Sequence, residues 1–337
     1  MTSEKKFRNE YIDILKGLAA YMIVLYHFTE YGFVDFGFRT GEPYFPMMSK
    51  ILLGICAAGV PIFFWTNGIT TIDKNYSLRK AGLRLFNIAK VYFLWGTMGY
   101  LILSQSRVTF ANIGAGLIHN VYYFWFFKTL GLLVVIQWVY AKIGRPKWLM
   151  LAGWTMLFVF PFITNTVFDI VRFIKPEYPQ PAWAHTGVFT LYSLVYFFGC
   201  KIITRENPLW INVALIIAGA VLNAFVVWVN ARGAKIIPDN VNGMFPSLGA
   251  LMMTVGIIQI IRKYHGFPGK LVISWFGRNC LGIYIFHVPM IFLFRRMYDG
   301  TMPMTAAVGI SILILIVAAS LTEAIQRTPF VRQLIKI

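Results

Sequence analysis

Apolar residues gather along the chain in long runs, and polar or proline-containing stretches separate these runs. Each run approaches the ~20 residues that a helix needs to cross a ~30 Å hydrocarbon core. We expect about ten such helices, over residues 11–31, 47–72, 81–104, 123–140, 148–168, 187–203, 210–230, 244–261, 271–294 and 304–324. Residues 105–122 are amphipathic and are expected to lie along the membrane interface. The pattern predicts an all-α, polytopic integral membrane protein.

Composition supports a membrane protein with a single domain. Hydrophobic residues make up 58% of the chain and charged residues 13%, whereas an ordinary soluble domain has about 25% charged residues. The basic start MTSEKKFR leads directly into the first apolar run without a small-residue cleavage site, so no cleavable signal peptide is expected. Because the apolar runs continue almost to the end, we expect one transmembrane domain over residues 1–337 with no appended soluble domain.

The net charge of +18 is explained better by membrane topology than by nucleic-acid binding. If the N-terminus is cytoplasmic, most Lys and Arg residues lie in the inner segments and at the adjoining helix ends. Cytoplasmic loops of membrane proteins carry this excess, so the pattern favours both termini in the cytoplasm. The positive residues are dispersed and form no compact basic module, which argues against a nucleic-acid partner.

The first apolar run, YIDILKGLAAYMIVLYHF, contains Asp13, Lys16 and His27. An ionisable residue inside a membrane span is by default a functional-site hypothesis. Lys16 and His27 are eleven residues apart, so they share one helix face and are separated by about 16 Å along the axis. The alternative is that Lys16 extends to the cytoplasmic headgroups and His27 caps the outer end of the helix.

A second polar motif lies in the run GVPIFFWTNGI, residues 59–69, which contains Trp65 and Asn67. Pro61 withdraws a backbone donor and weakens the helix, while Gly59 and Gly68 permit close approach of another helix or a ligand. The run therefore predicts either a kinked, ligand-lining helix or ordinary glycine packing around a tolerated proline.

Basic residues follow in and before the third predicted helix. Arg79 fits positive-inside anchoring, but Arg84 and Lys90 lie progressively deeper in the helix, where a cation needs a partner. Trp125 begins the next long helix, and an aromatic belt explains it as well as a binding role does.

Near the end, SWFGRNCLGIYIFHVPMIF places Arg278 and Asn279 just before Tyr284 and His287. Tyr284 and His287 are three residues apart and share a helix face. The alternative for His287 is a buried histidine satisfied by a neighbouring group. The cysteines fall in separate predicted helices with no CxxC or ligand spacing, so neither a disulfide nor a metal site is expected.

Taken together, these motifs resemble the acyltransferase family 3 integral membrane proteins over nearly the whole chain. The first helix resembles the family's aspartate, arginine and histidine pattern, with Lys16 in place of the commoner arginine, which loses a bidentate grip on a phosphate or carboxylate. Asn67 stands where serine is commoner, and a proline usual after the position of Arg84 is missing. The late helix is in register at Gly277, Asn279, Leu281, Ile283, Tyr284, His287 and Pro289.

The resemblance implies transfer of an acyl group, usually acetyl, from acyl-CoA to a hydroxyl of a cell-envelope glycan or a lipid-linked saccharide, in the inner (plasma) membrane. His27 can accept the proton of the sugar hydroxyl, and the thiol of coenzyme A leaves readily as thiolate. No protein nucleophile is then needed, and no GxSxG elbow is present. The expected site comprises catalytic His27 and Lys16; donor-binding Lys16, Arg79, Arg84 and Lys90; and substrate-binding Asp13, Trp65, Asn67, Trp125, Arg278, Asn279, Tyr284 and His287.

A transporter of polysaccharide or of a small anionic solute is the alternative from another class, with buried cations lining a pathway. Transporters tend to show internal repeats with interrupted helices in matching positions. We find no convincing self-similarity between the two halves of this sequence. Acyl transfer with acyl-CoA as donor, the lipid bilayer as surroundings and no metal is therefore the preferred hypothesis.

Overall fold

The computed structural model describes residues 10–30, 47–104, 107–118, 124–159, 171, 175, 189–232, 247–298 and 302–337. Within these ranges the chain is helical and contains no strand. The elements are α1 (Glu10–Glu30), α2 (Met47–Cys56), α3 (Gly59–Thr71), α4 (Leu78–Ser104), α5 (Phe110–Ile118), α6 (Trp125–Lys142), α7 (Lys147–Leu157), α9 (Phe189–Ile202), α10 (Leu209–Arg232), α11 (Leu248–Lys263), α12 (Lys270–Arg278), α13 (Cys280–Met297), α14 (Met304–Arg327) and the 3-10 turn η5 (Val331–Leu334). The prediction of an all-helical protein is confirmed.

Four segments are long and apolar enough to cross a membrane, among the residues that the structure describes. They are Glu10–Thr29, Leu52–Thr71, Cys280–Met297 and Met304–Arg327. The expected number of about ten spans and the cytoplasmic position of both termini remain predictions. Parts of the expected helices over residues 148–168 and 187–203, and of the amphipathic segment 105–122, lie outside the described residues.

The single helix predicted over residues 47–72 is divided into α2 and α3 at Ala57 and Ala58. Pro61 explains the position of the break, because proline has no N–H to donate to the carbonyl four residues earlier and its ring clashes with that carbonyl. This carbonyl belongs to Ala57. The backbone N–H of Ile62 resumes the helical pattern by donating to Ala58 O over 3.0 Å.

The helix predicted over residues 271–294 is also divided, into α12 and α13, and the division falls at Asn279. The side-chain amide of Asn279 donates to the carbonyl of Trp275 over 3.0 Å. The backbone N–H of Asn279 donates to Trp275 O and Phe276 O. Asn side chains compete for backbone hydrogen bonds in this way and disfavour a continuous helix, so the local sequence explains the junction.

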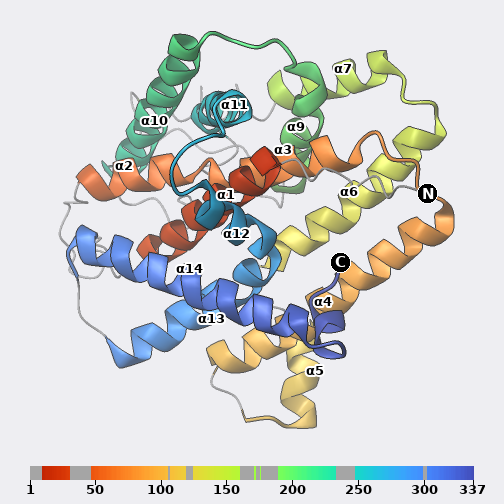
Figure 1. The fold of residues 1–337 in the computed structure, drawn as a ribbon, viewed down its shortest axis with the longest axis vertical. Helices are drawn as coiled ribbons and strands as arrows, with labels where there is room; N and C mark the ends of the chain where they lie inside the picture. The colour runs from red at the N-terminus through yellow and green to blue at the C-terminus, as the bar shows by residue number, and fades with distance from the viewer. Residues whose placement is uncertain are drawn as a thin grey trace.

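The centre of the molecule is α1, which packs against α12, α3, α14, α13 and α2 (Figure 1). Its contact with α12 is a backbone-to-backbone contact. A Cβ atom added at Gly17 would overlap the carbonyl of Ile273, and one added at Gly277 would overlap the carbonyl of Asp13. Glycine at both positions therefore permits the two helices to touch, and it fixes the late part of the sequence against the first helix.

A buried polar network joins α2, α10 and α11. The side-chain amide of Asn223 donates to Gly54 O over 3.3 Å, and the hydroxyl of Ser247 donates to Asn223 Oδ1 over 2.5 Å. The same hydroxyl accepts the backbone N–H of Ala250 over 3.0 Å and caps α11. Satisfied networks of this kind hold helices together where water is scarce.

Large apolar side chains also point outward from several helices. Phe86 of α4 is 66% exposed, Val221 of α10 is 63% exposed and Leu313 of α14 is 57% exposed. Contiguous exposed apolar surface is uncommon on soluble proteins and marks contact with a membrane or a partner. The outward apolar faces and the apolar spans together support an integral membrane protein.

Candidate active site

Two histidines from opposite ends of the sequence meet between α1 and α13. His27 lies in the last turn of α1, and His287 lies in the middle of α13. Their ring centroids are 5.3 Å apart and their planes are inclined by 41°. The structure therefore brings together the two histidines that the sequence singled out in separate motifs.

His287 is held in one orientation by its own helix. Its side chain is completely buried, and its Nδ1 lies 3.0 Å from the carbonyl oxygen of Ile283 and 2.8 Å from that of Tyr284. Because carbonyl oxygens only accept, Nδ1 carries a proton in this geometry. The ring of Tyr284 lies 5.7 Å from the His287 ring.

His27 is more accessible than His287. Its side chain is half-buried, whereas His287 is fully enclosed. The ring of Tyr26 meets the His27 ring edge-on with 5.4 Å between centroids. Of the two imidazoles, His27 is therefore the one that a substrate can reach from outside the helix bundle.

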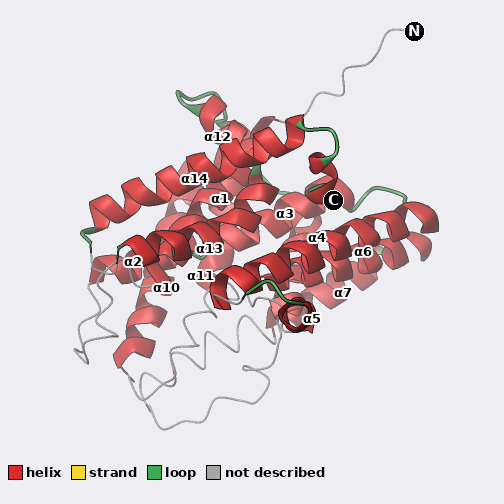
Figure 2. Cartoon of the chain, turned by 90° about the horizontal axis from the view of Figure 1, so that it is seen from below, coloured by secondary structure: helices red, strands yellow, loops and turns green. Residues whose placement is uncertain are grey.

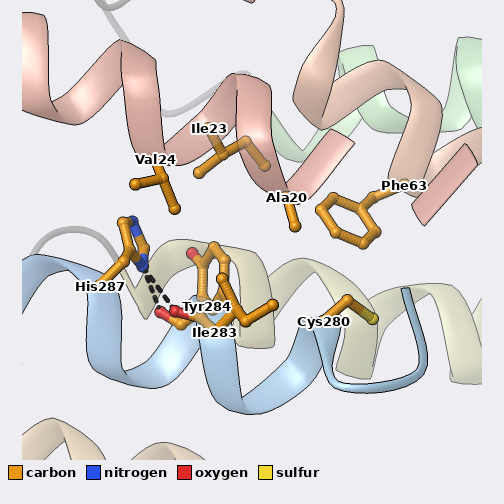
Figure 3. Close-up of a pocket in the computed structure, with 8 residues that line it drawn as sticks. All are labelled: Ala20, Ile23, Val24, Phe63, Cys280, Ile283, Tyr284 and His287. Carbon is orange, nitrogen blue, oxygen red and sulfur yellow. Dashed lines mark hydrogen bonds between the residues drawn. The ribbon is translucent and has the colours of Figure 1, made fainter. Parts of the chain in front are cut away.

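A narrow apolar pocket lies beside His287, between α1, α3 and α13 (Figure 3). It is a narrow gap between side chains that is partly open at its edge, and nowhere is it wide enough to seat a water molecule. In Figure 3 the side chain of Val24 faces His287, and Ala20 lies toward Cys280 at the other end. The pocket is lined by Ala20, Ile23, Val24, Phe63, Cys280, Ile283, Tyr284 and His287.

The opposite part of the same α1 face carries charged groups. Asp13 is 4% exposed and its backbone lies against Gly277 of α12. Lys16 is half-buried and forms no hydrogen bond or ion pair with another residue that the structure describes. Arg278, which follows Gly277, is exposed and donates to the hydroxyl of Ser274 over 3.1 Å. The crossing of α1 and α12 thus places Asp13 and Arg278 in one neighbourhood, one turn of α1 from Lys16.

Asn279 lies next to this charged end. It is 3% exposed and stands at the junction of α12 and α13. Its side-chain nitrogen donates a hydrogen bond to Trp275 O. Its Oδ1, however, accepts no hydrogen bond from any described residue. Asn279 therefore has an acceptor left over beside Cys280, which lines the pocket.

The structure does not bring the basic residues of α4 to this site. The helix packs against α6, α5, α13 and η5, and its first turns lie at the edge of the molecule, away from α1, in both views (Figure 1 and Figure 2). Arg79 is exposed. Arg84 donates to the hydroxyl of Tyr76 over 2.8 Å and stacks over its ring.

Lys90 forms hydrogen bonds with the segment that follows α14. Its ammonium group donates to the carbonyl of Gln333 over 2.5 Å. Nearby, the indole N–H of Trp95 donates to the carbonyl of Leu334 over 2.9 Å. Lys90 also donates to Asn87 Oδ1 over 3.3 Å and to Lys336 O over 3.5 Å. It thus finds the partners that a deep cation needs, chiefly in the backbone carbonyls of residues 333 and 336.

Trp65, Asn67 and Trp125 do not line the pocket. Trp65 is 4% exposed and packs against Gly199 of α9. Asn67 Oδ1 accepts the hydroxyl of Thr71 over 3.2 Å. Trp125 is half-buried, with its ring 6.2 Å from that of Phe64. In this structure these residues contribute to packing between α3, α6 and α9.

Sequence reasoning missed the apolar walls of the pocket. Ala20, Ile23 and Val24 lie between Lys16 and His27 on the same helix face, so helical spacing alone could have identified them. Phe63 lies in the run that Pro61 indicated as a possible ligand-lining helix, but the sequence did not distinguish it from its neighbours in that run. Nothing in the sequence indicated that aromatic residues of α6 surround Tyr284, such as Phe126 with 4.8 Å between the ring centroids.

An all-helical membrane protein with a paired-histidine site in its interior is the class that the fold and the site define. No group of three or more metal-ligating side chains occurs within the described residues. A family model described as an acyltransferase domain matches residues 9–323. The chain therefore belongs to acyltransferase family 3 and is a membrane acyltransferase. No curated protein and no solved structure matches the chain.

Proposed function

We propose that this protein transfers an acetyl group from acetyl-CoA to a hydroxyl of a cell-envelope glycan or of a lipid-linked saccharide in the inner (plasma) membrane. The family supports acyl transfer in general. The observation that carries the proposal is the meeting of His27 and His287, 5.3 Å apart between ring centroids, at the end of an α1 face that begins with Lys16. This arrangement offers a base at one end and a phosphate-binding cation at the other.

His27 acts as the general base in this proposal. It takes the proton of the attacking hydroxyl while the hydroxyl oxygen bonds to the thioester carbon, a role for which a neutral imidazole is suited near pH 7. The C–S bond then breaks and coenzyme A leaves as thiolate, which needs no strong acid because thiols ionise near pH 8.5. The thiolate or water then takes the proton from His27. The transfer is direct, so no acyl-enzyme forms.

His287 serves as a positioning residue. Its ring is fixed by the carbonyls of Ile283 and Tyr284, and its position beside His27 limits the orientations that the His27 ring can take. A catalytic base must stay within hydrogen-bond reach of the proton it removes, so a rigid neighbour favours the reaction. Burial of His287 keeps this neighbour from moving with the substrate.

Lys16 and Arg278 hold the phosphates of coenzyme A. Lys16 makes no polar contact with another described residue, and Arg278 is exposed beside the α1–α12 crossing. Phosphate oxygens form strong charge-assisted hydrogen bonds with such groups. The pantetheine arm then covers the distance of about 16 Å between Lys16 and His27 along α1. With the N-terminus in the cytoplasm, the donor enters from the cytoplasm and the acceptor meets His27 in the outer half of the membrane.

The proposal is tested with the purified protein in lipid nanodiscs, supplied with radiolabelled acetyl-CoA and a glycan extract of the cell envelope. His27→Ala should lower label transfer by about 10²–10⁴-fold, the usual contribution of general-base catalysis. The matched control is His265→Ala, because His265 lies beyond the end of α11 and its ring is hydrogen-bonded to the carbonyl of Arg262, 3.1 Å away. Equal transfer by both variants would remove His27 from the mechanism.

A further inference from the structure

The pocket beside His287 has a shape and chemistry that the transfer reaction alone does not explain. It begins at His287 and runs along α1 toward Ala20 and Cys280, between α1, α3 and α13 (Figure 3). Helical backbone forms its frame, so the N–H and C=O groups there are mostly bonded within the helices. Polar side-chain atoms come from His287, Tyr284 and Cys280, and the other lining residues are apolar.

We propose that this pocket receives the alkyl part of the donor's acyl group, and that Phe63 and Ile23 limit the enzyme to the shortest acyl chains. This inference rests on the proposed function, because it places the reacting thioester at His27. His287, which lines the pocket, is 5.3 Å from His27 between ring centroids. An acyl group whose carbonyl carbon lies at His27 can therefore extend its chain into the pocket.

The alternative occupant is the pantetheine arm, and the walls of the pocket argue against it. The arm contains two amide groups, and burial of an amide without a hydrogen-bond partner is strongly unfavourable. Ala20, Ile23, Val24 and Phe63 offer none. An alkyl chain has no such requirement and gains from burial. At a trigonal thioester carbon the chain and the sulfur also point in different directions, so the chain and the coenzyme take separate paths.

The narrowness of the pocket sets the limit on chain length. The gap between its side chains is too narrow for a water molecule, so the walls must move to admit even a methyl group. Each further methylene would press on a packed interior, which resists overfilling. One extra methylene in a hydrophobic pocket typically changes kcat/KM by about 10–200-fold. Acetyl should therefore be preferred strongly over propionyl, and propionyl over butyryl.

Phe63 and Ile23 are the bulkiest apolar walls that α3 and α1 contribute to the pocket. Phe63 of α3 is 9% exposed and Ile23 of α1 is 5% exposed, and both line the pocket (Figure 3). Phe64 provides a matched control. It is the adjacent phenylalanine on α3 and is completely buried, but it contacts Trp125 and Phe126 and does not line the pocket.

The experiment offers the nanodisc protein an equimolar mixture of acetyl-, propionyl- and butyryl-CoA with the same glycan extract. The acyl groups transferred are then counted by mass spectrometry. Phe63→Leu and Ile23→Ala should raise the butyryl-to-acetyl product ratio by about tenfold or more. Phe64→Leu should leave this ratio at its wild-type value. Ala20→Val, which narrows the pocket, should lower the propionyl-to-acetyl ratio further.

The outcomes separate the two proposals. Retained acetyl transfer with the same product ratio in Phe63→Leu, Ile23→Ala and Ala20→Val would overturn the pocket assignment and leave the proposed function intact. A wild-type protein that transfers butyryl as readily as acetyl would also overturn it. Failure of the wild-type protein to transfer any of the acyl groups would overturn both. Gel filtration of each variant confirms that it is folded, and Ala20→Val keeps the test valid if a truncated variant is unstable.

Discussion

The crossing of α1, α12 and α13 and the first turns of α4 both carry residues that the sequence assigned to the site, but the structure treats them differently. At the crossing, glycines bring the backbones into contact, and His27 and His287 meet in the interior. On α4, Arg84 and Lys90 are bonded to Tyr76 and to residue 333 at a distance from α1. Residues on one face of a packed helix stay together, whereas the cations of α4 take whichever partners the fold provides.

The largest effect on stability is expected when a side chain is placed at Gly277, in the close contact between α1 and α12. A Cβ atom at Gly277 would overlap the backbone carbonyl of Asp13, which cannot move without shifting α1. Gly277→Ala should therefore lower the free energy of unfolding by about 3 kcal/mol, at the upper end of overpacking costs. Thermal unfolding of the purified variant in detergent, followed by tryptophan fluorescence, measures the change.

Gly82→Ala is the matched control for this prediction. Gly82 lies in α4, and no atom lies within 4 Å of a Cβ atom added there. Alanine in an open helical position is more favourable than glycine by roughly 0.5–1 kcal/mol, so this variant should be slightly more stable. A Gly277→Ala variant as stable as wild type would show that α1 and α12 do not touch at this point.

A smaller effect, on the binding of acetyl-CoA, is expected at the charged end of the α1 face that carries His27. Lys16→Ala should raise the KM for acetyl-CoA by about tenfold, the loss expected for one charge-assisted hydrogen bond, and should leave kcat nearly unchanged. Lys16→Arg should restore donor binding, because the guanidinium also binds phosphate. Steady-state kinetics with varied acetyl-CoA at saturating acceptor measures both values.

Lys90→Ala on α4 is the control variant for Lys16→Ala. Lys90→Ala should change the KM for acetyl-CoA by less than about threefold. It should also make residues 333–337 more accessible to proteolysis, because a charge-assisted hydrogen bond to residue 333 is lost. A larger increase in KM for Lys90→Ala than for Lys16→Ala would assign the phosphates to α4. It would contradict the proposal that Lys16 binds them.

Much of the fold could be predicted from the sequence, because membrane-length apolar runs specify helices almost by themselves. The bounds of α1 and α14 differ from those predicted by only a few residues. The breaks before Pro61 and at Asn279 were not placed, although Pro61 indicated a kink. Where a helix breaks depends on competition for individual backbone carbonyls, and residue type indicates this competition without locating it.

The candidate site was predictable where it followed helical spacing and unpredictable where it depended on packing between distant segments. Lys16 and His27 share a face through periodicity alone. The contact between His27 and His287, the position of Phe63 and the bond from Lys90 to residue 333 each depend on how helices far apart in the sequence pack. A single sequence carries no direct signal for such contacts.

The account rests on His27 and His287 forming one catalytic unit, and a double-mutant cycle on kcat/KM tests this most directly. The transfer rates of His27→Ala, His287→Ala and the double variant are compared with wild type under the same conditions. Residues that act as a unit give strongly non-additive losses, so the double variant should be no slower than His27→Ala within about threefold. Losses that multiply fully in the double variant would show that the two histidines act independently.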